Sequence, residues 1–381
     1  MTAGRAPAVG SSKVAASCCT LLVLLLPLLF ALRAIGAPAA PGELARLERV
    51  VEGRAPGAQE DTSTSALFHA AAIPGEAWPD QPRAQRALLV RARVAQVIVL
   101  AGLGLLVYFA AALASGRLLG LLSCGALAAL PPVYEAGHVL RPETVGAFFA
   151  LLSVVLMQTA SLPAPQRRGR RPTEAALLGG GLLACAAVSI AVTCEALPSL
   201  GEALFVPGFV LLLSAADLGV RALRALRRRG LVGTPIRAVN RRLVPWTALG
   251  FLTPAVAFAV LSRSYTVSVE ALAVTAPQSR LLPHGAVLAG AAVALAAAGV
   301  CVLVARAGTR LGRGGRIGPE RVLLGYVVVF LLSSWVDDVA RDPLPVAPAL
   351  ALLCGLGARA LLALALGWRA RRRVASAAPS T

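Results

Sequence analysis

Residues 94–112, VAQVIVLAGLGLLVYFAAA, decide the fold of this chain. They contain no charged side chain, and about 20 such residues in a helix cross the ~30 Å hydrocarbon core of a bilayer. Similar runs recur at 21–32 and 322–332. Solid apolar runs indicate helices, because backbone groups in lipid must be hydrogen-bonded within their own segment. A membrane β-barrel would alternate polar and apolar residues instead.

The composition of the whole chain agrees with this reading. Of 381 residues, 57% are hydrophobic and 14% are charged, whereas ordinary globular proteins carry about 25% charged residues. This excludes a soluble enzyme and a disordered chain. We predict an all-α, polytopic membrane protein with about ten transmembrane helices. The expected spans are 17–36, 94–113, 117–132, 144–160, 174–193, 200–216, 243–262, 285–305, 322–336 and 346–367.

The basic residues, which give a net charge of +19, orient the chain. When the spans are threaded alternately, the clusters at 167–171, 221–242, 306–321 and 369–373 all fall on the side of the N-terminus. Loops rich in Lys and Arg stay in the cytoplasm, so both termini are predicted to be cytoplasmic. No aromatic platform or binding motif accompanies these clusters. We therefore expect contact with anionic membrane lipids and no nucleic acid.

We expect a single membrane domain over residues 1–381. It consists of a cytoplasmic N-terminus at 1–16, a large extracytoplasmic loop at 37–93, a transmembrane bundle at 94–367 and a basic cytoplasmic tail at 368–381. The first span has an alternative interpretation as a cleaved signal peptide. Lys13 is the sole lysine among 37 basic residues, which is typical of a GC-rich genome, and we expect a multi-pass protein of a bacterial inner membrane.

The outer face carries acidic residues next to arginines at the membrane boundary. Glu43 opens an amphipathic stretch at 42–52, with apolar residues at helical spacing, that is predicted to lie on the membrane interface. Glu143 directly precedes the span at 144–160. A carboxylate there can act as a general base toward an acceptor hydroxyl. Arg93 and Arg141 enter spans from the same face and can neutralise a lipid-linked phosphate. Capping of helix starts is the structural alternative for the two glutamates.

These residues carry a resemblance. The run 41–54, PGELARLERVVEGR, is similar to the first outer loop of the GT-C superfamily of membrane glycosyltransferases, in the protein mannosyltransferase and aminoarabinose transferase branch. Arg93, an apolar run to Tyr108, the Pro131–Pro132 pair and Arg141-Pro142-Glu143 also follow that family's order. The resemblance covers about residues 41–160.

The resemblance implies an enzyme that transfers a sugar from a polyprenyl-phosphate donor on the extracytoplasmic face. The acceptor would be an envelope glycan, lipid or protein. Carried over by position, Glu43 and Glu143 are the catalytic candidates, and Arg93 and Arg141 lie near the donor phosphate. The family's Asp-Glu pair reads Gly42-Glu43 here. A catalytically inactive relative is therefore one alternative, and a transporter or lipid-carrier flippase is another.

Three further residues attract attention. Glu135 and His138 lie three residues apart and are weak candidates for a divalent metal site, with a turn as the alternative; no cofactor is otherwise required. Arg359 falls near the middle of the last expected span. Because a charge in the bilayer is costly, we expect it to face the bundle interior and to find an acidic or carbonyl partner. It would act as a structural hub, or as a functional group holding a phosphate or a coupling ion.

Overall fold

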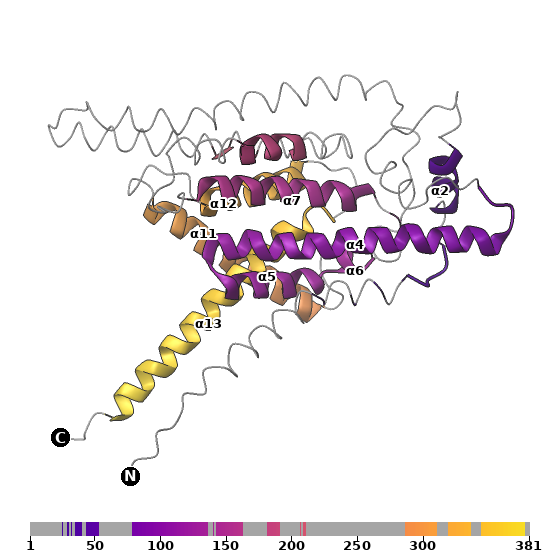
Figure 1. Ribbon diagram of the computed structural model, residues 1–381. Helices are drawn as coiled ribbons and strands as arrows, with labels where there is room; N and C mark the ends of the chain where they lie inside the picture. Colours follow the sequence, from indigo (N-terminus) through magenta and orange to yellow (C-terminus); the bar gives the residue numbers. More distant parts are fainter. Residues whose placement is uncertain are drawn as a thin grey trace, which may run out of the picture.

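The computed structural model of the chain is a bundle of α-helices (Figure 1). It describes residues 35–39, 43–52, 78–135, 142–162, 181–190, 286–310, 319–336 and 344–377, with Leu25, Leu29, Leu32, Leu140, Val206, Phe209 and Val210. Its named helices are α2 (Glu43–Glu52), α4 (Pro82–Ser115), α5 (Arg117–Ala128), α6 (Pro131–Glu135), α7 (Pro142–Ser161), α11 (Ala286–Arg310), α12 (Pro319–Val336) and α13 (Ala347–Ala377). Within these ranges every regular element is helical, which confirms the all-α prediction for this part of the chain.

Four described helices are long and apolar enough to cross a membrane. They are Pro82–Ser115, Glu143–Ser161, Val287–Ala305 and Ala347–Arg369, and each coincides with an expected span. This length and composition support a membrane protein. The expected spans at 17–36, 200–216 and 243–262 lie wholly or largely outside the described residues, and the span at 174–193 is described over Gly181–Ile190, which form an apolar helix. The total of ten spans and the cytoplasmic placement of both termini therefore stay predictions.

The expected continuous span at 117–132 is wrong in one respect. Helix α5 ends at Ala128, and α6 begins separately at Pro131. Adjacent prolines at 131 and 132 have no N–H to donate and clash with the preceding turn, so they start a new helix and cannot continue the old one.

Helix α4 is the longest element and positions the site. Its 34 residues begin with a proline at the first position, where proline is well tolerated. At 1.5 Å per residue it is about 51 Å long, against ~30 Å for the hydrocarbon core. It ends at Ser115 and is followed by the C-cap Gly116, whose φ of 94° is accessible to glycine and strained for other residues. Because the apolar run starts at Val94, residues 82–93 extend above the core on the predicted outer side.

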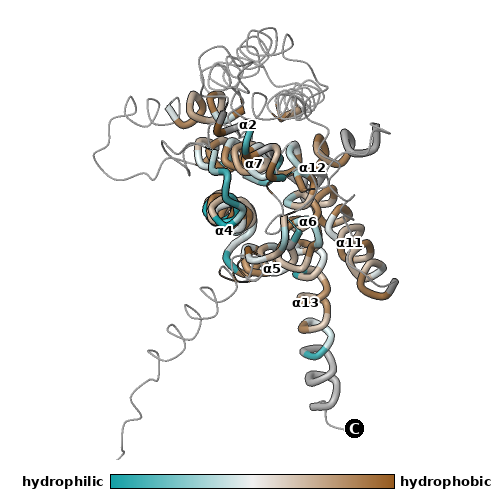
Figure 2. Tube along the Cα trace, turned by 90° about the vertical axis from the view of Figure 1, so that its right-hand side faces the viewer, coloured by the Kyte–Doolittle hydropathy of each residue, from teal (hydrophilic) through white to brown (hydrophobic). Residues whose placement is uncertain are grey.

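The bundle packs around α4. Helices α5 and α7 contact it directly, and α13 packs on both α5 and α11 (Figure 1). A Cβ atom on Gly299 of α11 would clash with the backbone of Leu353, and one on Gly357 of α13 would clash with that of Leu295. Small residues thus let α11 and α13 cross with their backbones in contact, as is common between membrane helices. Figure 2 shows both helices as mainly hydrophobic.

Arg359 of α13 contacts the last residue of α4. Its Nη1 donates a hydrogen bond to the carbonyl of Ser115, the last residue of α4, and the side chain is partly buried. The expectation of a carbonyl partner is confirmed. The expected depth stays a prediction, since Arg359 lies near the middle of the candidate span Ala347–Arg369 while its guanidinium reaches the last residue of α4. Arg359 therefore caps α4, where last-turn carbonyls have no partner within the helix.

Helix α2 also differs from its expected setting. It begins at Glu43 as the spacing predicted, and Leu47 and Val51 on one face are buried. Leu47 packs against Leu88, Leu89 and Ala92 of α4, so at least this part of the apolar face contacts protein and not lipid. Figure 1 shows α2 lying across the outer end of α4. This packing holds Glu43, the first residue of α2, against α4.

Candidate functional site

The site is built around an ion pair between Glu43 and Arg93. Arg93 Nη2 lies 2.7 Å from Glu43 Oε2, and Arg93 Nε lies 3.0 Å from Oε1, which is the bidentate geometry of a strong arginine–carboxylate pair. Both residues are about 1% exposed. The first residue of α2 is thus joined to α4 across 50 residues of sequence.

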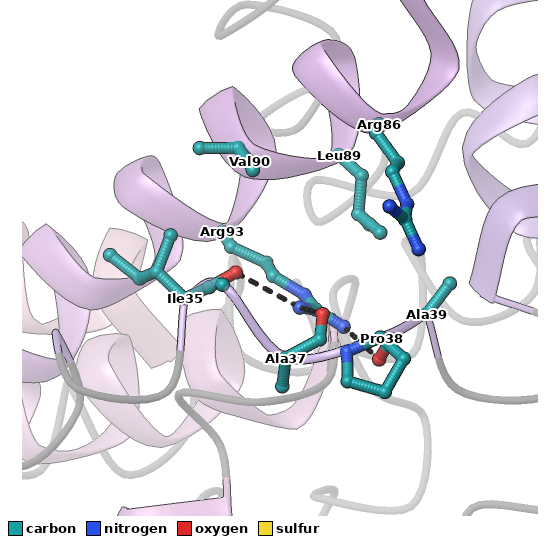
Figure 3. Close-up of a pocket in the computed structure, with 9 residues that line it drawn as sticks. Ile35, Ala37, Pro38, Ala39, Arg86, Leu89, Val90 and Arg93 are labelled. Atoms are coloured by element: carbon teal, nitrogen blue, oxygen red, sulfur yellow. Dashed lines mark hydrogen bonds between the residues drawn. The ribbon is translucent and has the colours of Figure 1, made fainter. Parts of the chain in front are cut away.

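Arg93 is fully engaged by the protein. Beyond Glu43, its Nη1 donates to the carbonyls of Ile35 and Ala37 at 3.1 and 2.7 Å, and its Nη2 donates to that of Pro38 at 3.3 Å (Figure 3). An arginine has five N–H donors, and each has an acceptor here. The guanidinium therefore holds the 35–39 turn, α2 and α4 together.

A third segment joins this centre through the backbone. The N–H of Leu140 donates to Glu43 Oε1 at 2.9 Å. Three residues of chain span at most about 11 Å, so the backbone of Glu143 lies within about 11 Å of Leu140. Glu143 is in the first turn of α7 and is partly buried. The two predicted acidic residues are thus brought into one neighbourhood.

The remaining candidates are placed only in part. Arg141 and His138 lie outside the described residues. Glu135 is the last residue of α6 and is partly buried. Among the residues that the structure describes, no group of three or more His, Cys, Asp or Glu side chains comes together. The Glu135–His138 metal site consequently stays a sequence prediction.

A cavity of about 170 Å³ lies beside the ion pair. Its walls are the 35–39 turn and one face of α4, with Arg86, Leu89, Val90 and Arg93. Figure 3 shows Arg86 and Arg93 both directed from α4 toward the turn, with Leu89 between them. Sequence reasoning missed Arg86. Its spacing of seven residues from Arg93, which places both on one helical face, was the available signal.

Comparison with solved structures finds the same fold in an archaeal membrane enzyme. The apo oligosaccharyltransferase of Archaeoglobus fulgidus matches with a TM-score of 0.55 and 12% identity, over 93% of this chain and 52% of that chain. The oligosaccharyltransferase AglB of the same organism, in complex with an inhibitory peptide and a dolichol-phosphate, matches with a TM-score of 0.54 and 11% identity, over 93% of this chain and 52% of that chain. The form of the enzyme tethered to an acceptor peptide with the NVT sequon matches with a TM-score of 0.57 and 13% identity, over 95% of this chain and 52% of that chain.

These matches support a GT-C-like fold for this chain. The chain spans about half the length of the structures it matches. No family model matches the sequence, and no curated protein matches it. The shared fold agrees with the expected architecture, whereas membership of the GT-C superfamily and of its mannosyltransferase or aminoarabinose transferase branch stays a prediction.

Proposed function

We propose that this chain is a membrane glycosyltransferase of the GT-C type, which transfers a sugar from a polyprenyl-phosphate donor to an acceptor on the extracytoplasmic face. The observation that carries this proposal is the fold shared with an oligosaccharyltransferase over 93–95% of the chain. One matched structure contains a dolichol-phosphate and an inhibitory peptide, and another contains an acceptor peptide. These complexes support a lipid-linked donor, and we propose a protein, lipid or glycan of the envelope as acceptor.

The two acidic residues have different settings within this proposal. Glu143 is partly buried at the start of α7, and we assign to it the proton transfer from the acceptor hydroxyl. The deprotonated oxygen attacks the anomeric carbon, and the polyprenyl phosphate leaves. Glu43, the other candidate, reaches a substrate only after releasing Arg93, so its contribution in the present geometry is to hold the Leu140 segment in place.

The donor phosphate needs positive charge at the same face. We retain Arg93 and Arg141 as candidates for this contact, on the strength of their sequence positions. All five N–H groups of Arg93 are used by the protein, so a direct phosphate contact requires the pair with Glu43 or a turn carbonyl to open. Arg141 is therefore the first residue to substitute in a test of the contact with the donor phosphate.

A transfer assay tests the proposal. The full chain in liposomes would be supplied with a polyprenyl-phosphate sugar, and transfer by Glu143→Gln would be compared with that by Glu48→Gln. Glu48 is a partly buried residue of α2 outside the site and serves as the matched control. We expect Glu143→Gln to slow transfer by about 10²–10⁴-fold, the usual value of a general base, and Glu48→Gln to leave it unchanged. Equal rates for the two variants would rule out the role of Glu143.

One observation favours a second candidate, a catalytically inactive relative. The acidic pair of the family is reduced to Gly42-Glu43, and Glu43 is enclosed and fully paired with Arg93. A well-folded protein that transfers no sugar from any polyprenyl-phosphate donor would support it. The transporter alternative rests on Arg359, which in this structure donates to the carbonyl of Ser115 at the end of α4.

A further inference from the structure

The outer end of α4 carries arginines that the candidate site does not use. Residues 82–91 contain Arg83, Arg86 and Arg91 and no acidic residue, and the acidic residue next to this stretch in sequence is Asp80. All three arginine side chains are exposed. Within the described part of the chain, Arg83 and Arg86 make no hydrogen bond or ion pair. We call the three arginines the basic ridge.

The basic ridge is a single surface of the helix. At 100° per residue its members fall within an arc of about 140°. The opposite side of α4 holds Leu88, Leu89 and Ala92, which are buried and pack with Leu47 of α2. The helix thus turns its apolar side to the protein and its basic side to the surroundings.

The height of the basic ridge separates it from the lipid. The apolar run of α4 begins at Val94, and at 1.5 Å per residue Arg86 and Arg83 stand about 12 and 16.5 Å further along the helix. The headgroup layer is only ~5–8 Å thick on each side of the core. A helix tilt of about 20° would shorten these heights by only about 6%. Arg83 and Arg86 therefore stand in water on the predicted outer side, and a membrane lipid is not the partner that fits them.

The basic ridge has the chemistry to bind a chain of repeated anions. Protein partners are held mainly by aromatic and apolar anchors in buried pockets, whereas the exposed residues between these arginines are Ala87 and Val90. Guanidinium groups bind carboxylates and phosphates through paired N–H donors. In an acidic glycan the carboxylate is attached directly to the sugar ring, so binding orders fewer rotatable bonds than it does for the acidic side chains of a peptide.

We propose that the basic ridge is the docking surface for an anionic glycan of the cell envelope. The glycan would be the acceptor if the proposed function holds, and only that role rests on the proposed function, because docking requires no sugar transfer. Arg86 also lines the cavity beside the Glu43–Arg93 pair (Figure 3). A glycan on the basic ridge would therefore lie next to the candidate site.

Glycan binding to the full chain tests this surface. The protein would be placed in phosphatidylcholine nanodiscs, which leave both faces accessible, and its affinity for polygalacturonate would be measured. Polyglutamate of the same chain length and neutral dextran are the comparison probes. The double variant Arg83→Gln with Arg86→Gln would be compared with Arg117→Gln with Arg369→Gln, which removes the same charge from exposed positions of α5 and α13.

We expect the double variant of the basic ridge to bind polygalacturonate about five-fold more weakly than the parent, the value of two exposed ion pairs. The control variant should match the parent, polyglutamate should bind more weakly than polygalacturonate, and dextran should not bind. Equal losses for the two double variants would show an effect of net charge alone and overturn the docking surface. Polyglutamate that binds as tightly as polygalacturonate would overturn the assignment to a glycan, and dextran that does so would overturn the role of charge.

This test and the transfer assay fail separately. Specific binding of polygalacturonate by a protein that transfers no sugar would leave the docking surface standing and contradict only the proposed function. Sugar transfer by a protein whose affinity for polygalacturonate does not depend on Arg83 and Arg86 would contradict only the docking surface.

Discussion

Two arginines join α4 to neighbouring segments, and they are engaged to different extents. Arg93, at the outer end of the apolar run of α4, is buried and uses every N–H donor on two other segments, α2 and the 35–39 turn. Arg359 at the other end is partly buried and makes one hydrogen bond, to the carbonyl of Ser115, within the described structure. The outer end is thus organised as a site, whereas the inner end is only capped.

The largest effect is expected from breaking the outer pair. Arg93→Met leaves the Glu43 carboxylate buried without its partner, which costs about 3–5 kcal/mol of unfolding free energy. Unfolding of the purified protein in detergent would measure it. The double variant Arg93→Met with Glu43→Leu should recover most of the loss, because two apolar side chains can replace a buried pair. A double variant as unstable as the single one would show that the turn carbonyls, and not Glu43, dominate the cost.

A smaller loss of unfolding free energy is expected from a substitution at Gly116, between α4 and α5. Gly116→Ala places a Cβ in open space at a φ of 94°, so any loss comes from backbone strain, of order 1–3 kcal/mol. Gly125→Ala is the control, since its Cβ also meets open space and its place inside α5 favours alanine. The two variants should move the unfolding midpoint in opposite directions. Shifts of the same sign would argue against strain at Gly116.

The smallest effect is expected from the inner cap. Arg359→Met removes a single hydrogen bond, worth about 1 kcal/mol. The same unfolding measurement would rank it below Arg93→Met and Gly116→Ala. Arg93 and Arg359 are separated by most of α4, so the double variant should show additive losses within about 0.5 kcal/mol. A loss at Arg359 as large as that at Arg93 would contradict the contrast between the two ends.

Much of the fold was predictable from apolar run length. The four candidate spans and the start of α2 at Glu43 follow from hydropathy and helical spacing. The particular partner of Arg359 was not predictable, because hydropathy locates an apolar run but not which carbonyl of a neighbouring helix lies beside it. The break before α6 was visible in the adjacent prolines at 131 and 132.

The sequence predicted which residues belong to the candidate site better than it predicted the hydrogen bonds that they make. The resemblance grouped Glu43, Arg93 and the segment before Glu143, and Leu140 confirms that this segment lies beside Glu43. It did not indicate that Arg93 would be saturated by Glu43 and three carbonyls. The pairing of Glu43 with Arg93 across 50 residues of sequence depends on how the intervening segment folds. The spacing of charged residues along the sequence does not indicate that fold.

The length of α4 has a consequence for how this site evolves or can be engineered. Inserting one residue between Val94 and Gly116 would raise the outer turns by about 1.5 Å and rotate them by about 100° relative to the bundle. Arg86 and Arg93 would then turn together away from the 35–39 loop. The residue count of α4 therefore fixes both the height of the site above the lipid and the direction it faces, so length changes there should be far less tolerated than substitutions on its lipid-facing side.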